Sequence, residues 1–443
     1  MKKSVILFFL LISVQTFYSQ TKEWTLEQCV AHALENNISI KQSELELEST
    51  DIDKLVAVGN FLPTLNANAN GAKNTGLSLN PTNNQLENMT FGTASGAINV
   101  GLNLFDGLRN VRQLQRAKLS KLSAQYRLDQ MKDDIALMVA NSYLQVLLNK
   151  ANLEVARSQN EVTQEQFQRT SDLVEAGAIP RGDLLEIQAT DASEKQRIAV
   201  AENTVRISLI SLAQLLLIKD YSNFDIAEED YDIVEDGIAA LEVEEIIENA
   251  QATRSEVKIA EQSVSLAKKD IQIAKGAYYP TVSAFFGYNT RYANNDPLNH
   301  TFIEQLSLND GIGYGVQLNI PVFNGFTVRG NVRRNEINLR NSEYLLEQAK
   351  LDLESNVYQA YVDAKGSRKA YDAAVVALES QELAYQYAKD RYDVGLTNAF
   401  DFSQSKLRYD NSKIEVNRTK FEYIFKLKVL ELYFGVPASE LKF

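Results

Sequence analysis

Four short segments of the chain alternate apolar and polar residues, as strands of a sheet with two unlike faces do. They lie at about 62–70, 91–105, 279–290 and 311–323. Such strands suit a wall between lipid and water, although a soluble sheet with one buried face has the same alternation. In the last segment the side chains expected to face lipid are Ile312, Tyr314, Val316, Leu318 and Ile320, and they alternate with Gly313, Gly315, Gln317 and Asn319.

Long helical patterns follow each pair of strands. No proline interrupts about 108–175 or 327–393, and at 1.5 Å per residue helices of that length span about 100 Å. A short turn and a return helix follow each of them, which predicts antiparallel hairpins over about 107–218 and 325–434. Heptad spacing is found at Leu137, Ala140, Leu144, Leu147 and Ala151, and again at Val357, Ala360, Ala364, Ser367, Tyr371, Ala374 and Leu378.

The second half of the chain repeats the first. Three motifs recur in the same order roughly 218 positions later: 61–65 as 278–282, 102–107 as 318–325, and 174–177 as 392–395. One such match would mean little, but three at a nearly constant offset indicate duplication. We therefore expect a first repeat at 20–218, an equatorial segment at 219–241, a second repeat at 242–434 and a C-terminal tail at 435–443.

Each repeat also opens with a helix of half the length. These helices are expected at 25–60 and 242–276, and Thr25 is a candidate N-cap for the first. Because the return helices have a similar length, two half-length helices laid end to end match one long helix. This arithmetic predicts a rod with a seam at mid-height, where residues 219–241 would lie.

The N-terminus predicts a secretory signal peptide at 1–19, since Lys2 and Lys3 precede a short apolar run and small Ser19 precedes the expected cut. No later apolar run has the length of a transmembrane helix, and the mean hydropathy is -0.25. The short alternating strands of a transmembrane barrel remain possible, because hydropathy barely registers them. The single cysteine, Cys29, lies in a helical pattern that favours buried packing over lipidation.

Charge and composition exclude several classes of protein. The net charge of -13 argues against nucleic-acid binding and fits a lumen that favours cations. His32 and His300 lack metal-ligand spacing, and no nucleophile elbow or phosphate-binding loop occurs, so no catalytic, cofactor or metal site is expected. A secreted enzyme is therefore disfavoured. A periplasmic coiled-coil adaptor or structural protein stays as the alternative, but it would not need four alternating strands.

The number of strands bears on the oligomeric state. Four strands cannot close a barrel, and open sheet edges would be unsatisfied in lipid. Three copies supply twelve strands, which is a closable pore. The predicted fold is thus mainly α with a transmembrane β-barrel, built from a duplicated helix–strand–strand–helix–helix unit in a trimer, with a long periplasmic coiled-coil barrel.

The duplicated Pro-Thr strand starts, the Leu-Phe-Asp-Gly and Val-Phe-Asn-Gly corners and the paired glycine turns resemble the TolC-like outer-membrane efflux family over essentially the whole mature chain. The resemblance implies a homotrimer with a twelve-stranded barrel in the outer membrane. It also implies a periplasmic adaptor and an inner-membrane RND or ABC transporter as partners. The expected function is a passive export duct for small molecules or proteins; the cargo depends on the pump, which this sequence does not contain.

The resemblance also implies roles for residues near the two turns. By motif position Asp183, Tyr392 and Asp401 correspond to constriction residues, while Gln404 stands where a second aspartate is known and Thr397 where an arginine is known. Each aspartate begins a return helix, so N-capping is an expected role for both. The turns are expected to dock the adaptor through Gly177, Ala178, Val394, Gly395 and Leu396.

Overall fold

The computed structural model describes residues 23–79, 85–228, 231 and 238–436. The expected signal peptide (1–19) and residues 437–443 of the expected tail lie outside them. The chain divides into two compact units. The helical unit comprises Met1–Lys41, Met131–Thr253 and Glu354–Phe443, and the sheet unit comprises Gln42–Gln130 and Arg254–Leu353.

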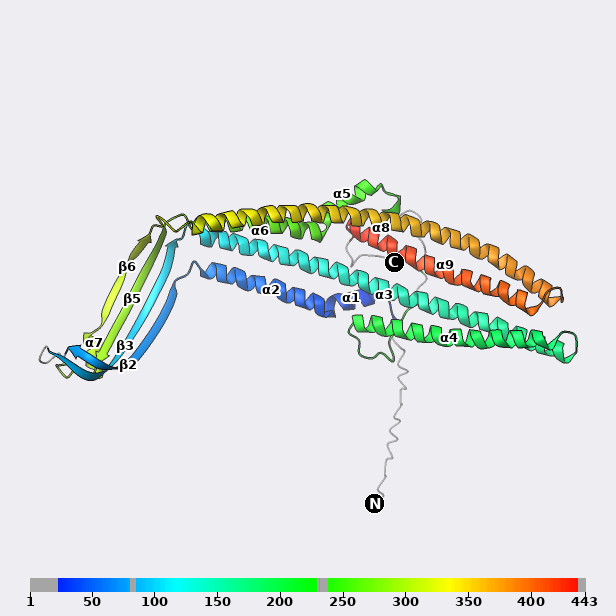
Figure 1. Ribbon diagram of the computed structural model, residues 1–443, viewed down its shortest axis with the longest axis horizontal. Helices are drawn as coiled ribbons and strands as arrows, with labels where there is room; N and C mark the ends of the chain where they lie inside the picture. The colour runs from blue at the N-terminus through cyan, green and yellow to red at the C-terminus, as the bar shows by residue number, and fades with distance from the viewer. Residues whose placement is uncertain (1–22, 80–84, 229–230, 232–237, 437–443) are drawn as a thin grey trace, which may run out of the picture. The chain divides into compact units, whose positions relative to one another are not determined.

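The same order of elements occurs twice along the described chain (Figure 1). Matching helices have matching lengths, 11, 22 and 67 residues in both halves, and 35 and 36 residues for the return helices. The first set is α1 (Leu26–Asn36), α2 (Ile38–Gly59), β2 (Thr64–Leu79), β3 (Leu86–Phe105), α3 (Arg109–Glu175) and α4 (Arg181–Leu215). The second is α5 (Val243–Thr253), α6 (Ser255–Gly276), β5 (Thr281–Ala293), β6 (Gly311–Asn319), α8 (Thr327–Asp393) and α9 (Ala399–Phe434).

Shorter elements complete the described chain. The strands β1 (Glu23–Trp24) and β4 (Asp225–Ile226) pair in parallel, and a 3-10 turn (Ile238–Ala240) precedes α5. Helix α7 (Phe302–Leu308) lies between β5 and β6. Thr25 is the N-cap of α1, as expected, and its hydroxyl accepts a hydrogen bond from the Gln28 amide.

The helices expected at 25–60 and 242–276 are each broken in two, which the sequence pattern did not predict. At Asn37 the backbone is extended (φ -59°, ψ 135°) and the side chain accepts a hydrogen bond from the Ser39 amide at 2.8 Å. Asparagine competes for backbone groups in this way, and so interrupts a helix. Arg254 takes a similar conformation (φ -68°, ψ 135°) between α5 and α6.

Several strand boundaries also differ from expectation. β2 and β3 extend far beyond the strands expected at about 62–70 and 91–105, and Thr75 and Thr90 share a hydrogen bond of 2.9 Å across the added part of the pair. Threonine suits a strand because its branched side chain fits the pleat. β6 ends at Asn319 rather than at 323, because Pro321 has no N–H to continue the ladder.

In the sheet unit the strand order is β2-β3-β5-β6, and every neighbouring pair is antiparallel. The register sorts the side chains by face. One face carries apolar residues at matched levels, for example Leu65, Val100, Phe286 and Tyr314, and the other carries Asn66, Asn99, Gly287 and Gly313. The alternation predicted from sequence is therefore continuous across all four strands.

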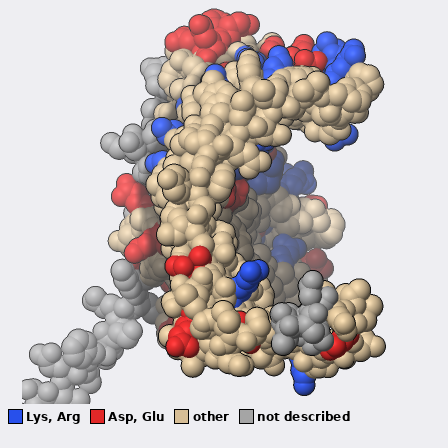
Figure 2. Space-filling view, turned by 90° about the vertical axis from the view of Figure 1, so that its left-hand side faces the viewer, with Lys and Arg blue, Asp and Glu red and all other residues tan. Residues whose placement is uncertain are grey.

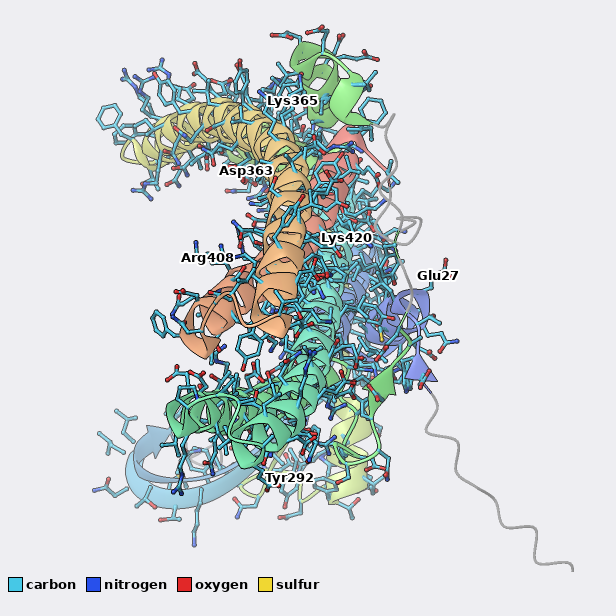
Figure 3. The ribbon with its side chains drawn as sticks, turned by 90° about the vertical axis from the view of Figure 1, so that its right-hand side faces the viewer. Glu27, Tyr292, Asp363, Lys365, Arg408 and Lys420 are labelled. Atoms are coloured by element: carbon cyan, nitrogen blue, oxygen red, sulfur yellow. The ribbon has the colours of Figure 1, made fainter. Side chains whose placement is uncertain are left out.

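In the helical unit α3 and α4 form one antiparallel hairpin and α8 and α9 form another (Figure 1). Figure 3 views them along their length, with Asp363 and Lys365 on α8 and Arg408 and Lys420 on α9. Most of the predicted heptad positions lie in the core: Ala140, Leu144 and Leu147 are buried on α3, and Val357, Ala360, Ala364, Ser367 and Ala374 on α8. The others, Leu137, Ala151, Tyr371 and Leu378, are half-buried. Among the described helices, none has an apolar stretch long enough to cross a membrane.

Candidate functional site

The two tip turns of the helical unit have the same backbone design. α3 ends with the Ala178 amide donating to the Leu173 carbonyl (2.9 Å) and the Gly177 amide to that of Val174 (3.0 Å). This is the pattern of a Schellman cap, which needs a left-handed residue, and Gly177 has φ +71°. Gly395 has φ +73°, and Leu396 donates in the same way to Arg391 at 2.7 Å. Open space surrounds both glycines, so conformation alone selects glycine there.

The surfaces of the tips are apolar and exposed. Val394 is 69% exposed and Leu396 is 70% exposed, and Gly177 and Ala178 are exposed as well. Immediately behind the second turn, Arg169 of α3 pairs with Asp393 of α8 at 2.9 Å. The five residues expected to form a docking surface are thus accessible and are displayed by firmly capped helix ends.

Tyr392 belongs to an aromatic cluster behind this turn. Its ring stacks on Phe402 with the centroids 5.0 Å apart, and Phe402 also contacts Tyr385 at 6.0 Å. Tyr385 stacks in turn on Tyr409 at 5.1 Å. The Tyr392 hydroxyl shares a 3.0 Å hydrogen bond with Thr170 of α3. The tyrosine expected at a constriction is therefore half-buried and held by its own subunit.

N-capping was the wrong role for the two aspartates. The N-cap of α4 is Pro180, with Asp183 inside the first turn, and the N-cap of α9 is Asn398, whose side chain accepts from the Asp401 amide at 2.8 Å. Asp401 instead accepts a hydrogen bond from Thr397 at 3.3 Å. Both carboxylates still favour their helices, because the N-terminal turn carries partial positive charge. Asp401 is exposed and Asp183 half-buried.

A buried ionic cluster, which the sequence reasoning missed, lies farther from the tips. The Lys406 ammonium donates to Glu194 (2.7 Å), to Thr163 (2.9 Å) and to the Gln159 carbonyl (2.8 Å), and it lies 3.7 Å from Asp410. Lys406, Glu194 and Asp410 are each 5–6% exposed. Three helices, α3, α4 and α9, thus meet at one lysine. The available signal was spacing, since Lys406 and Asp410 follow Phe402 at intervals of four on the buried seam.

Burial changes the titration of two side chains in this region. Desolvation raises the pKa of Asp410 to about 6; Lys406 and Lys413 oppose the rise, and Glu194 adds to it. Desolvation, with Asp410 nearby, also raises the pKa of Tyr385 to about 12.

Gln404 is exposed on α9 and lines a groove of about 250 Å³ between α4 and α9, together with Glu194 and Lys406.

The apolar face of the sheet is open to its surroundings. Its most exposed strand is β6, and the face continues into the residues that follow it. Figure 2 views the molecule from the left-hand side of Figure 1, and the nearest surface is mostly uncharged. The five residues predicted to face lipid are exposed to 64% (Ile312), 81% (Tyr314), 64% (Val316), 59% (Leu318) and 57% (Ile320).

No group of three or more histidine, cysteine, aspartate or glutamate side chains in the described residues could hold a metal ion. The described residues form a sheet with one apolar face, long helices and two exposed tips.

Comparison with known proteins decides the family. Residues 30–216 and 246–425 match the outer membrane efflux protein family, and these segments cover most of both halves of the chain. The chain belongs to this family. The family assigns this outer membrane efflux protein to the outer membrane, with a periplasmic extension, and to export through a channel in efflux or type I secretion.

Individual relatives are distant but cover most of this efflux protein. Outer membrane protein TolC of Vibrio cholerae is 25% identical over 318 residues, which are 71% of this chain and 70% of that protein. Cation efflux system protein CusC of Escherichia coli K12 is 23% identical over 393 residues, 86% of this chain and 79% of that protein. The solved Campylobacter jejuni CmeC outer membrane channel has the same fold, with a TM-score of 0.80 and 17% identity over 93% of this chain and 85% of that one.

Proposed function

We propose that three copies of this outer membrane efflux protein close into a twelve-stranded barrel in the outer membrane, continued by a helical duct in the periplasm. An adaptor would dock at the tips and link the duct to an inner-membrane RND or ABC transporter. Cargo would pass through passively, driven by that pump. The duct itself carries out no chemistry.

The sheet is the observation that carries this proposal. β2 and β6 are its outer strands, and four strands of this length cannot curl into a closed barrel. The apolar face would be in water if the chain were a lone soluble domain, whereas lipid accepts it without cost. Lipid in turn forbids open edges, so β6 of one copy must pair with β2 of the next. Both strands then lie antiparallel, as a barrel requires.

The helices support the same assembly. Exposed apolar residues recur at seven-residue steps on α8 at Ile337, Tyr344, Leu351 and Tyr358. α2 repeats the pattern at Ile38, Leu45 and Ile52. Heptad stripes of this kind are the seams of coiled coils, in which each helix buries its stripe against a partner. We infer that α8 of one copy packs on α2 of the next, directly beneath the strand pairing.

The tips supply the mouth and the docking surface. We infer that Asp183 and Asp401 give the pore mouth an acidic lining and that Gln404 lies one helical turn from Asp401. Tyr392 supports the wall of the mouth through its contacts with Phe402 and Thr170. Exposed Val394 and Leu396 offer the adaptor an apolar contact, with Gly177, Ala178 and Gly395 beside them.

The expected signal peptide at 1–19 would direct export of the chain itself, and N-terminal sequencing of the mature protein tests its removal.

The deciding experiment is the mass of the assembly. The protein is extracted from outer membranes in mild detergent and its mass is measured by native mass spectrometry. We expect a trimer that conducts ions in planar bilayers. A pore-competent monomer would overturn the proposed architecture, and a protein that fractionates with the periplasm would favour a coiled-coil adaptor.

Function at the tips is tested separately from assembly. Gly395→Trp should leave trimers intact but abolish export, because it alters only the docking end; normal export by such trimers would exclude the tip as the docking site. Asp401→Ala should raise single-channel conductance and weaken block by cations. Unchanged conductance would restrict Asp401 to supporting its helix.

A further inference from the structure

The two outer strands of the sheet have unequal lengths. β2 has 16 residues and β6 has nine, so at least seven residues of β2 lack a partner when β6 of another copy pairs with it. Along the ladder the start of β6 at Gly311 is level with Asn289, Ala97 and Asn68, and β2 continues from there to Leu79. The β2–β3 hairpin therefore projects beyond the rest of the sheet on the side away from the helices.

Among the described residues, no strand pairs with the outer edge of this projection. Such an edge binds other chains or aggregates unless something covers it. The hairpin also displays leucines there: Leu77 is 67% exposed, Leu79 is 52% exposed and Leu86 is 65% exposed. Leu79 and Leu86 are directly opposite each other, and Leu77 lies two residues along, so all three share one face. This face continues the apolar face of the sheet.

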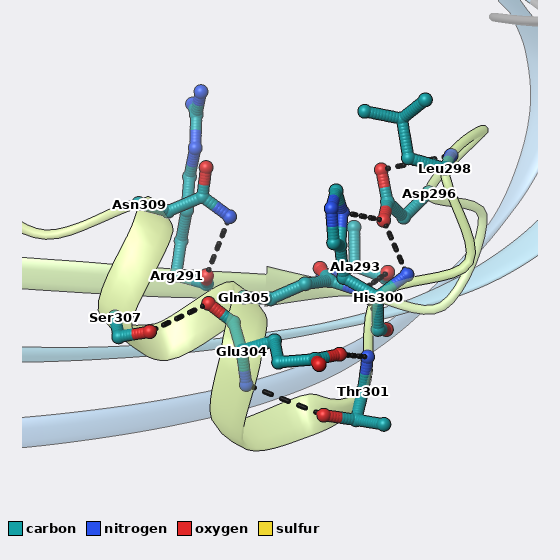
Figure 4. Close-up of polar contacts among 10 residues, drawn as sticks. All are labelled: Arg291, Ala293, Asp296, Leu298, His300, Thr301, Glu304, Gln305, Ser307 and Asn309. Atoms are coloured by element: carbon teal, nitrogen blue, oxygen red, sulfur yellow. Dashed lines mark hydrogen bonds and ion pairs between the residues drawn. The ribbon is translucent and has the colours of Figure 1, made fainter.

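The short helix α7 lies beside the end of β5, against residues 290–293, which are level with residues 69–72 of β2 (Figure 4). It is fixed to the end of β5 by side chains that bind backbone. Gln305 is 4% exposed; its side chain accepts from the Ala293 amide at 2.9 Å and donates to the Ala293 and His300 carbonyls at 3.0 and 3.1 Å. Thr290 donates to the Leu306 carbonyl at 2.6 Å and Asn309 to that of Arg291 at 3.2 Å.

The N-terminal end of α7 is equally well fixed. Thr301 and Glu304 form a reciprocal capping box, and the preceding turn is closed by Asp296, which accepts from the His300 amide at 2.9 Å and lies 2.8 Å from the His300 ring. Phe302 packs edge-on against Tyr292, with the ring centroids 4.9 Å apart. A seven-residue helix is marginal by itself, so this amount of anchoring indicates that its position matters.

The outward side of this anchored helix is apolar. Gln305 points to β5, and Ile303, two residues before it, is on the opposite side of the helix and 71% exposed. Leu308 is 64% exposed and Leu298, in the turn before the helix, is 74% exposed. A polar surface would suit an isolated loop in water. A firmly anchored helix with an exposed apolar surface instead implies that another surface packs against it.

We propose that α7 of one copy packs on the β2–β3 hairpin of the neighbouring copy and covers the β2 edge that β6 is too short to reach. The proposal rests on the trimer proposed above. The start of β2, which follows α2, and the end of β6, which precedes α8, lie at the same end of the sheet. When β6 pairs with the neighbour's β2, it therefore covers β2 from that end. The uncovered residues are then those toward Leu79. α7 is anchored level with residues 69–72, which is beyond the start of β6 and on the side toward these uncovered residues.

Disulfide trapping tests this contact in the full-length protein. Ile303→Cys is combined with Leu77→Cys or with Leu79→Cys, and outer membranes are oxidised with copper phenanthroline. Because a disulfide needs Cα atoms about 4.4–6.8 Å apart, only a true neighbour is trapped. We expect covalent trimers on non-reducing denaturing gels that revert to monomers with reductant. The native Cys29 is fully buried, and burial raises the pKa of its thiol to about 12, so it does not compete.

The matched control pairs Ile303→Cys with Leu65→Cys. Leu65 is 70% exposed and lies on the same strand and face, but it is twelve residues from Leu77, about 40 Å along the strand. This pair and each single variant should yield monomers. A disulfide within one chain would also leave the monomer mass and would count against the proposal.

The result separates this inference from the proposed function. If native mass spectrometry finds trimers and neither test pair is trapped, α7 does not cover the neighbour and the hairpin leucines face lipid. If the protein is monomeric, the proposed trimeric duct is wrong, and the α7 contact that rests on it is rejected with it. Covalent trimers from the test pairs but not from the Leu65 pair would support both.

Discussion

In the helical unit the large side chains of the packing seams lie inside, whereas in the sheet unit comparable side chains lie on the surface. Phe402 is 2% exposed and Tyr385 is 7% exposed within one subunit, yet Tyr314 is 81% exposed. The helical unit even buries a lysine and two carboxylates, and the lysine pairs with both of them. In the part of the chain that the structure describes, the sheet has neither a second layer nor a closed edge.

This difference shows where each unit obtains its stability. Burial of apolar area drives folding in water, and the helical unit achieves it within one chain. In the proposed assembly, the sheet obtains the equivalent from lipid and from other copies. Damage to the helical seam should therefore reduce the stability of the subunit, while damage to the sheet should reduce assembly. The following experiments test that division, from the largest effect to the smallest.

Lys406→Met should have the largest effect. It leaves Glu194 and Asp410 buried without their cation, and we expect the free energy of unfolding to fall by about 3–5 kcal/mol in urea titrations in detergent. Arg418→Met is the matched control, because Arg418 pairs with Glu415 and Glu422 at half-exposed positions and should cost less than about 1 kcal/mol. Equal losses would show that the buried cluster is no more important than a surface pair.

Val316→Arg should block assembly by placing charge on the apolar face. Near the bilayer midplane the cost is about 2–4 kcal/mol, and the yield of heat-resistant trimer measures it. Gln317→Arg, one residue along on the polar face, should assemble and alter ion selectivity. If both variants assembled equally well, the two faces would be misassigned or the sheet would not be in lipid.

Asp410→Asn should change how stability depends on pH. The folded pKa of about 6 lies above the ordinary value for aspartate, so the folded state holds the proton more tightly. The resulting stabilisation is complete below about pH 4 and is lost as the pH rises through 6, by about 3 kcal/mol. Unfolding at pH 4 and pH 7 should reveal this loss in the parent protein but a smaller one in the variant. An unchanged pH dependence would mean that Asp410 titrates normally.

Gly395→Ala should have the smallest effect. Its φ of +73° costs a side chain about 1 kcal/mol, and no neighbour would clash with the new methyl group. Gly366→Ala, in the middle of α8 with equally open surroundings, should instead stabilise by about 0.5–1 kcal/mol. Calorimetry that found the same sign for both would indicate that the tip conformation is relaxed by assembly.

Several features of the fold were predictable because they depend on local patterns. The long helices were expected at about 108–175 and 327–393 and lie at Arg109–Glu175 and Thr327–Asp393, since an uninterrupted heptad pattern needs only local contacts. The breaks at Asn37 and Arg254 were not foreseen, and at Asn37 the hydrogen bond of a single side chain decides the break. The extension of β2 to Leu79 was missed because polar strands resemble loops in composition.

The candidate site was predictable to a similar degree. Gly177 and Gly395 were identified from the repeat alone, because only glycine adopts a left-handed turn easily. The capping residues were misassigned by three positions, since Asn398 and Pro180 compete with the aspartates for the same role. Lys406 was missed altogether, as its partners Glu194 and Gln159 are distant in sequence.

The sequence by itself determined the periodic features of this outer membrane efflux protein: the duplication, the two faces of each strand, the heptad seams and the glycine turns. Each follows from the geometry of one element, in which side chains recur every two or every three to four residues. Only the tertiary structure decided which charges are buried together, which aromatic ring holds Tyr392, and that α7 is anchored level with a hairpin longer than its neighbouring strands. Those features depend on contacts between segments far apart in the chain, and no local period encodes them.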